Sequence, residues 1–287
     1  MTQARISWER NVEHRYPYGS RSPDPDRLEP LGFPPPWPDR PWIYSNVITS
    51  RNGIIAWTRR GPDDDPIRAI AGGDFTRPGR RADVQLMRYL RACADAVSVG
   101  AQTIRDQPGL IGTLGHAGSD LGEVLERFRA SQGLRRLPLQ VVYTQSGDID
   151  LDARLFNTPG VEVLVITTEH GARRLRARGS QRRGVTLVIE GEESLGPSEL
   201  VRAHRRLRAE FAVRYLDCEG GATILDAFHD AGIADEIFVT MTDVRIDLSE
   251  HEGVKRLFSL EGARLIAEGH TESDASYVFR RWRINER

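Results

Sequence analysis

The amino-acid sequence predicts an α/β protein with a mixed, mostly parallel sheet. Between residues 95 and 231, apolar strand-like segments alternate with segments of helical periodicity. Two of these strands run into a glycine loop that opens a helix, at Gly100 and at Gly220-Gly221. Beyond residue 234, three strand-like segments follow one another with little helix between them, which is typical of antiparallel pairing at one edge.

The composition is typical of a soluble globular protein and gives no sign of a nucleic-acid or membrane protein. The 287 residues are 39% hydrophobic and 28% charged, with a formal net charge of −1. A near-neutral chain has no overall field that attracts nucleic acid or anionic membranes. No segment reaches the ~20 apolar residues of a membrane span, and the N-terminus lacks the apolar core of a secretory signal. We therefore expect a cytoplasmic protein.

The two cysteines, Cys93 and Cys218, lie far apart in or beside apolar stretches. Neither belongs to a cluster with metal-ligand spacing, so we expect reduced, buried thiols and no metal. Arginine-rich stretches at 173–183 and 202–208 are expected to form solvated helix faces.

The N-terminal 40 residues read as an irregular arm, and the folded body is expected over 41–287. Eight prolines among residues 1–40 exclude long helices and central strands, while five aromatic residues favour packing against the body. In the body, a strand is expected at 42–48, a long polar loop at 58–81 and a helix at 82–92. Loops of that length are usually functional lids or disordered segments.

The remaining elements follow from hydrophobic periodicity. Strands are expected at 95–99, 139–144, 161–167, 185–190 and 212–217, and helices at 101–106, 119–131, 169–178, 197–209 and 221–231. The last strands are expected at 235–242, 263–269 and 276–284, with a short helical turn near 252–258.

The glycine loops carry the functional signal. Glycine lets a ligand approach the backbone, and the free N–H groups at a helix start attract anions. Either loop alone could be an ordinary turn between a strand and a helix. Two such loops in one domain suggest a ligand with more than one phosphate, such as a dinucleotide. Neither loop has the G-x-G-x-x-G spacing, so a Rossmann domain gains no support.

The order of the motifs resembles a known family. The chain has S-x-x-G at 50–53, R-x-D-V-Q-L-x-R at 81–88, A-D-A-V-x-V-G-A-x-T-x-R at 94–105 and E-G-G-A-T-I-L at 219–225. This resembles the reductase domain of riboflavin biosynthesis, a branch of the dihydrofolate reductase superfamily. The resemblance runs from about residue 41 to residue 283. It implies a three-layer α/β/α fold and an NADPH-dependent reductase of a small substrate, most simply a (phospho)ribosylamino-pyrimidine.

The resemblance also implies site residues. The positions that match the NADPH-binding parts of the family are Thr49, Gly100, Ala101, Thr103, Arg105, Thr144, Gly220, Gly221, Ala222, Thr223 and Ile224. Those that match the substrate side are Ser50, Asn52 and Arg88, with Arg88 placed to hold a sugar phosphate. Glu219 matches an acid near the substrate or nicotinamide, and Asp106 matches an acidic position after the Thr103 loop. Either could order a proton-donating water. The family also implies a homodimer through a sheet edge, for which the strand near 277–284 is the candidate.

Four departures from the family surround the expected substrate pocket. Asn52 stands where the family has the aspartate of S-L-D-G, which removes a charge and any acid–base role. The segment 105–108 is one residue shorter, the 58–81 loop is longer, and 242–251 replaces a glycine-containing turn. They leave two alternatives open: a reductase of a different small substrate in a specialised pathway, or a non-catalytic NADP(H)-binding protein. Residues 1–40 are too short for the zinc deaminase that accompanies some family members.

Overall fold

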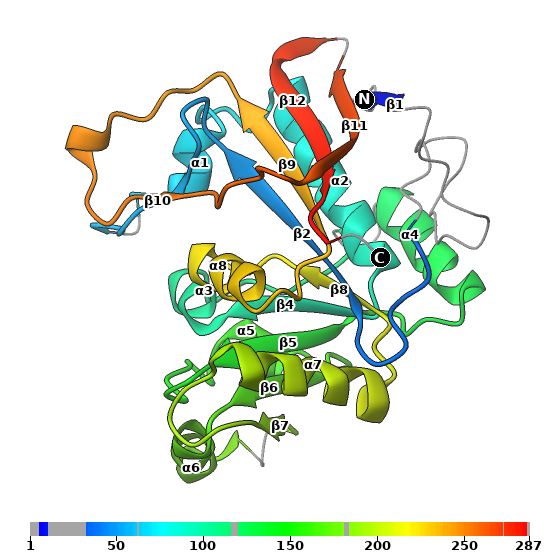
Figure 1. Ribbon diagram of the computed structural model, residues 1–287, viewed down its shortest axis with the longest axis vertical. Coiled ribbons are helices and arrows are strands. Elements are labelled where there is room, and N and C mark those ends of the chain that lie inside the picture. Colours follow the sequence, from blue (N-terminus) through cyan, green and yellow to red (C-terminus); the bar gives the residue numbers. More distant parts are fainter. Residues whose placement is uncertain are drawn as a thin grey trace.

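One large twisted sheet organises the molecule (Figure 1). The computed structural model describes residues 6–10, 33–61, 63–115, 120–180, 184–271 and 273–285. The strand order in this sheet is β1-β11-β12-β9-β2-β8-β4-β5-β6-β7. The bounds are β1 (Ile6–Arg10), β2 (Trp42–Thr49), β4 (Ala96–Gly100), β5 (Leu139–Thr144), β6 (Val163–Thr167), β7 (Thr186–Ile189), β8 (Tyr215–Cys218), β9 (Glu236–Thr242), β11 (Arg264–Thr271) and β12 (Asp274–Arg283).

The predicted mixed topology is confirmed. The seven strands from β9 to β7 in the sheet order pair in parallel. The strands β12, β11 and β1 continue the sheet in antiparallel pairs. A separate two-stranded sheet joins β3 (Ile54–Ala56) to β10 (Lys255–Arg256). Parallel strands deliver their carboxyl ends to one edge, which is where ligands bind in open α/β sheets.

Helices cover both faces of the sheet and make the three layers. On one face lie α1 (Pro66–Ile70), α2 (Pro78–Cys93) and α4 (Asp120–Ser131), whose apolar side chains share a core with those of β2 and β9. On the other face lie α7 (Pro197–Phe211) and α8 (Ala222–Asp230). A third core lies beneath α3 (Ala101–Asp106), α5 (Arg154–Asn157) and α6 (Glu169–Ala177).

The polar stretch 58–81 is more structured than its sequence predicts. It contains α1, which Asp65 caps by accepting hydrogen bonds from the N–H groups of Ile67 and Arg68. It also contains the first turn of α2, which begins at Pro78 and not at residue 82. Proline suits the first turn of a helix because its missing N–H has no partner there. The carboxylate of Asp274 on β12 accepts from the N–H of Gly79, a capping contact invisible in the local sequence.

The expectation of an irregular N-terminal arm is wrong for residues 6–10, which form β1 and pair with β11. No proline interrupts those five residues, and an open sheet edge offers them hydrogen-bonding partners. Residues 33–40 pack on the body as expected: the ring of Phe33, 1% exposed, stacks on Tyr44 with centroids 4.3 Å apart. The rest of the arm lies outside the described residues, and the domain boundary at 41 stays a prediction.

The turn expected near 252–258 is instead β10, after a 3₁₀ turn at Leu248–Glu250.

The strand β12 is not the sheet edge that the sequence suggested for dimerisation. It lies between β9 and β11, and the end strands of the sheet are β1 and β7. Two of its arginines, Arg281 and Arg283, are buried and form ion pairs with Glu236 on β9, at 2.6 and 2.8 Å. The Arg281 guanidinium also lies over the ring of Phe33. The homodimer therefore stays a prediction without the 277–284 edge as its basis.

Candidate active site

The two glycine loops meet at the carboxyl ends of two neighbouring strands. Gly100 ends β4 and opens α3, while Gly220 and Gly221 follow β8 and open α8. These strands pair directly in the sheet. A Cβ atom at Gly221 would lie 3.4 Å from the Thr103 hydroxyl oxygen, so the second loop touches the helix that follows the first.

The loops form a cradle of bare backbone. Gly221 has φ +69°, a conformation that side chains with a Cβ rarely adopt. A Cβ at Gly100 or Gly220 would lie 3.2 or 3.1 Å from the Ile224 side chain, tighter than normal packing allows. Backbone N–H groups at such helix starts suit phosphate oxygens. The residues present thus fit the pyrophosphate of a dinucleotide, which Gly100, Gly220 and Gly221 would hold together with Ala101, Thr103, Ala222, Thr223 and Ile224.

Thr144 and Arg105 lie beside this cradle in roles that the sequence did not specify. Thr144 is buried, and its hydroxyl accepts a hydrogen bond from the N–H of Gly147 at 3.1 Å, which shapes the turn after β5. Arg105 is exposed on α3 and reaches that same turn, where it donates to the carbonyl oxygen of Asp148.

Glu219 is committed to an ion pair. Its carboxylate accepts from Nε and Nη2 of Arg91 on α2, the latter at 2.6 Å, and the Arg91 side chain is 7% exposed. Arg91 also donates to the carbonyl oxygen of Thr113 at 2.9 Å. This geometry favours a role for Glu219 in positioning the second glycine loop against α2. Sequence reasoning did not select Arg91, although its place among the apolar positions of the predicted helix was a signal of an inward-pointing charge.

A second carboxyl, Asp217, lies next to this pair and was also missed. Asp217 is fully buried on β8, and among the described residues neither of its carboxyl oxygens has a hydrogen-bonding partner. Burial raises the pKa of Asp217 well above its usual range, and the negative charge of Glu219 raises it further while Arg91 opposes the shift. Burial therefore favours the protonated, uncharged form of Asp217 over the ionised form.

The side chains of Ser50 and Asn52 close a turn at the end of β2. The Ser50 hydroxyl donates to Oδ1 of Asn52 at 2.9 Å and accepts from the N–H of Ile54 at 3.0 Å, and Ser50 is fully buried. Nδ2 of Asn52 donates to the carbonyl oxygen of Ile246 at 2.9 Å, and its Oδ1 accepts from the N–H of Ile246 at 3.1 Å. An aspartate cannot make this two-way contact because an ionised carboxylate has no donor. The departure at 52 thus has a structural reason, and the assignment of Ser50 and Asn52 to the substrate side stays a prediction.

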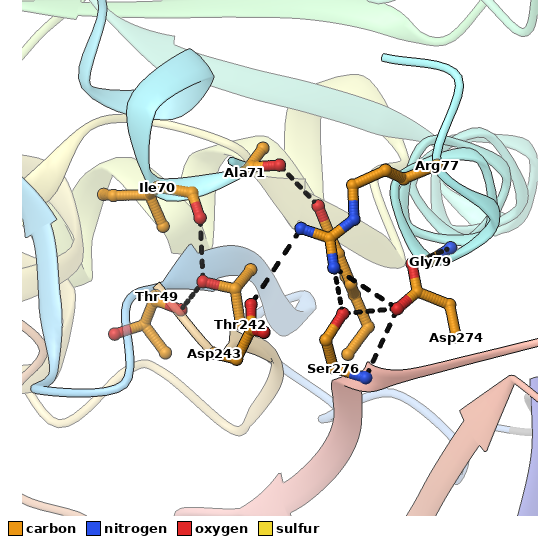
Figure 2. Close-up of polar contacts among 10 residues, drawn as sticks. Thr49, Ile70, Ala71, Arg77, Gly79, Thr242, Asp243, Asp274 and Ser276 are labelled. Atoms are coloured by element: carbon orange, nitrogen blue, oxygen red, sulfur yellow. Dashed lines mark hydrogen bonds and ion pairs between the residues drawn. The ribbon is translucent and has the colours of Figure 1, made fainter. Parts of the chain in front are cut away.

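A group of hydrogen bonds and ion pairs holds the 58–77 segment beside the ends of β2 and β9 (Figure 2). The Thr242 hydroxyl contacts the carbonyl oxygens of Ile70 at 2.7 Å and Thr49 at 3.5 Å. Thr49 itself is buried, with its hydroxyl directed to the carbonyl oxygen of Ile54. On the other side, Arg77 pairs with Asp274 at 3.4 Å and hydrogen-bonds to Ser276. The segment expected to be a lid or disordered is therefore anchored from both sides.

The remaining predicted residues are Arg88 and Asp106. Arg88 is half-buried on α2, and among the described residues no carboxylate pairs with it. Burial and the nearby charge of Arg91 lower its pKa, so this cation lacks compensation and would gain from an anionic partner. Asp106 is exposed at the end of α3 and accepts from Nε2 of Gln102 at 2.8 Å. Its carbonyl oxygen accepts from Arg59 at 3.4 Å, which brings the 58–77 segment to the first glycine loop.

Metal-ligand clusters and membrane-spanning helices are both absent from the described ranges. These ranges contain no group of three or more His, Cys, Asp or Glu side chains that could hold a metal ion. None of their helices combines the length and apolar character that crossing a membrane requires.

A mixed sheet with helices on both faces and glycine loops at adjacent strand ends defines a three-layer α/β protein. The family model of the RibD C-terminal domain matches residues 41–245, and the chain belongs to this family. It is 26% identical over 194 residues to the 2,5-diamino-6-ribosylamino-4(3H)-pyrimidinone 5′-phosphate reductase of Aquifex aeolicus, a match that covers 64% of this chain and 76% of that relative.

Solved structures share the fold. A pyrimidine reductase-like protein from Corynebacterium diphtheriae matches with a TM-score of 0.60 at 23% identity, over 87% of this chain and 94% of that one. RibD of Acinetobacter baumannii matches with a TM-score of 0.59 at 16% identity, over 87% of this chain and 59% of that one. The dihydrofolate reductase-like architecture predicted from the motifs is confirmed.

Proposed function

We propose that this protein is an NADPH-dependent reductase that transfers hydride to a (phospho)ribosylamino-pyrimidine in riboflavin biosynthesis. The observation that carries the proposal is the cradle that the two glycine loops form at the carboxyl ends of β4 and β8. Membership of the RibD C-terminal domain family supports the reductase class. The Aquifex aeolicus relative is a ribosylamino-pyrimidinone phosphate reductase by name, which supports the substrate.

The residues of the chain would supply binding, orientation and exclusion of water. NADPH, when bound, supplies the hydride, and the cradle holds its phosphates. Arg88 would hold the substrate phosphate because it is a half-buried cation without a described acidic partner. The Arg91–Glu219 pair would keep the second glycine loop in register with α2. Asp106, whose carboxylate is exposed, is the better placed of the two predicted acids to order a proton-donating water.

One of the four departures that raised the two alternatives has a structural explanation. Asn52 raised the non-catalytic alternative in particular, but its amide is engaged with both backbone groups of Ile246. This contact explains asparagine at 52 without any change of chemistry. The cytoplasmic location and the homodimer are further parts of the proposal that rest on the family resemblance.

Titration with NADPH, followed by tryptophan fluorescence, tests the proposal first. We expect saturable binding, weaker by about tenfold or more in Gly221→Ala, because alanine is strained at positive φ and its methyl group crowds the cradle. Gly109→Ala is the matched control, since no atom lies within 4 Å of its Cβ position. The second step is to follow NADPH absorbance with the ribosylamino-pyrimidine phosphate present. Binding without oxidation would leave a non-catalytic protein, and no binding would refute the reductase assignment.

A further inference from the structure

Three arginines from two helices converge on one carboxylate, that of Asp148. Arg105 on α3 lies 3.6 Å from Oδ2 of Asp148. Arg174 on α6 and Arg178 just beyond it lie 3.8 and 3.9 Å from Oδ1. Two of the guanidiniums are also held by backbone carbonyls, since Arg105 donates to Asp148 and Arg174 donates to Ser146 at 3.0 Å. These four side chains are called the arginine cluster below.

The backbone that carries the arginine cluster is closely packed. Gly147, with φ +69°, lies against Gly171 in the first turn of α6, so closely that a Cβ on either would overlap the other's backbone. The Thr168 hydroxyl donates to the carbonyl oxygen of Gln145 at 2.7 Å and accepts from the N–H of Gly171 at 3.0 Å. The turn after β5 and the start of α6 therefore form one unit, which sets Asp148 at a defined place before the arginines of α6.

The charges of the arginine cluster do not balance. Three guanidiniums face one carboxylate, and within the described ranges no other acidic group pairs with any of the three. The side chains are partly exposed, at 37%, 45% and 44% for Arg105, Arg174 and Arg178. Guanidiniums are suited to bidentate contacts with phosphate oxygens, and two uncompensated charges match a phosphate monoester dianion.

The arginine cluster lies beside the glycine cradle. Thr103, which touches Gly221, and Arg105 are two residues apart on α3. The elements that bear the cluster follow β4, β5 and β6, three neighbouring strands whose carboxyl ends share one edge. An anion bound by the arginines would thus lie on the same edge of the sheet as phosphates in the cradle.

We propose that the arginine cluster binds the 2′-phosphate that distinguishes NADPH from NADH, with Arg174 and Arg178 as specificity-determining residues. In the absence of that phosphate, the Asp148 carboxylate forms ion pairs with the three arginines. When the phosphate binds, it replaces Asp148 as their anionic partner. The stretch 173–183, expected from sequence to be a solvated helix face, therefore contains two arginines with a binding role. The proposal rests on the proposed function, because it presumes that the cradle takes a nicotinamide dinucleotide.

The test compares NADPH and NADH binding by tryptophan fluorescence in the whole protein. Changing Arg174→Ala and Arg178→Ala together should weaken NADPH binding roughly 10- to 100-fold, as expected for the loss of charge-assisted hydrogen bonds, and leave NADH binding within about twofold. Arg173→Ala with Arg176→Ala is the matched control, since it removes the same charge from exposed positions of α6. Asp148→Asn should strengthen NADPH binding alone, because the competing carboxylate is gone.

The outcomes separate the two proposals. An unchanged NADPH affinity in the Arg174/Arg178 double variant would overturn the arginine cluster as the 2′-phosphate site. Equal losses of affinity for NADPH and NADH in the double variant would also overturn it, because a folding defect would explain them. An equal loss of NADPH affinity in the Arg173/Arg176 control would overturn it too, because the overall positive charge of α6 would then explain the effect. A wild-type protein that binds neither dinucleotide would refute the proposed function and this inference together.

Discussion

Arg91 and Glu219 are 128 residues apart in the chain and form a bidentate, largely buried ion pair between α2 and the second glycine loop. The contact joins the helix that crosses one face of the sheet to the backbone that would cradle the cofactor. It also assigns Glu219 a partner that its position before the glycines did not reveal.

Glu219→Gln should reduce both stability and cofactor affinity. The change leaves Arg91 without its charged partner in a largely buried position, a loss that typically costs about 3–5 kcal/mol. Chemical denaturation measures the first effect, and NADPH titration the second. If turnover falls while stability and NADPH affinity stay at wild-type values, Glu219 acts directly on the reaction and the positioning role is wrong.

Asp217→Asn should stabilise the protein at neutral pH. The folded-state pKa of Asp217 is raised by burial, so the folded chain binds a proton that the unfolded chain releases. Wild-type stability therefore declines as pH rises from the unfolded-state pKa, near 4, toward the raised folded-state value. Asparagine has no proton to lose, so the advantage of the variant should grow with pH through that window and vanish below it.

Urea denaturation of the wild type and Asp217→Asn at several pH values between 4 and 8 measures this. Asp230→Asn, at an exposed acid, is the control and should leave the pH dependence unchanged. A stability difference that is constant with pH would show that Asp217 does not take up a proton on folding.

Asn52→Asp restores the family residue and should destabilise the protein. The carboxylate cannot donate to the carbonyl oxygen of Ile246, which is left without this hydrogen bond, whereas it can still accept from the Ser50 hydroxyl. The expected cost is about 1–3 kcal/mol, the range for an unsatisfied buried polar group. Thermal unfolding checks this. A variant as stable as the wild type but with altered substrate preference would return Asn52 to the substrate site.

Arg88→Ala should raise KM for the phosphorylated substrate with little change in kcat. A contact made equally in the bound substrate and the transition state contributes to binding and not to the chemical step. Steady-state kinetics at saturating NADPH measures the two constants separately. Arg81→Ala, at an exposed position on the same helix, is the control. If KM is unchanged in Arg88→Ala, the substrate phosphate is held elsewhere.

Local pattern was enough to predict most of the architecture. The alternation of strands and helices, the positions of both glycine loops and the antiparallel end of the sheet are all read from hydrophobic period and turn residues, which depend on neighbours a few positions away. The order of the motifs was enough to recognise the family. Errors fell where a distant segment supplies the missing partner, as for β1 against β11 and for Asp274 at the start of α2.

The sequence by itself determined which backbone would be bare enough to hold phosphates, because glycine and the start of a helix are local features. Only the tertiary structure decided what the polar side chains around that backbone do. Asn52 meets Ile246 across 194 residues, and Arg174 meets Asp148 only because two glycines let α6 approach the turn after β5. A charged or amide side chain takes its role from the partner that the chain path brings to it, and that path is a property of the whole fold.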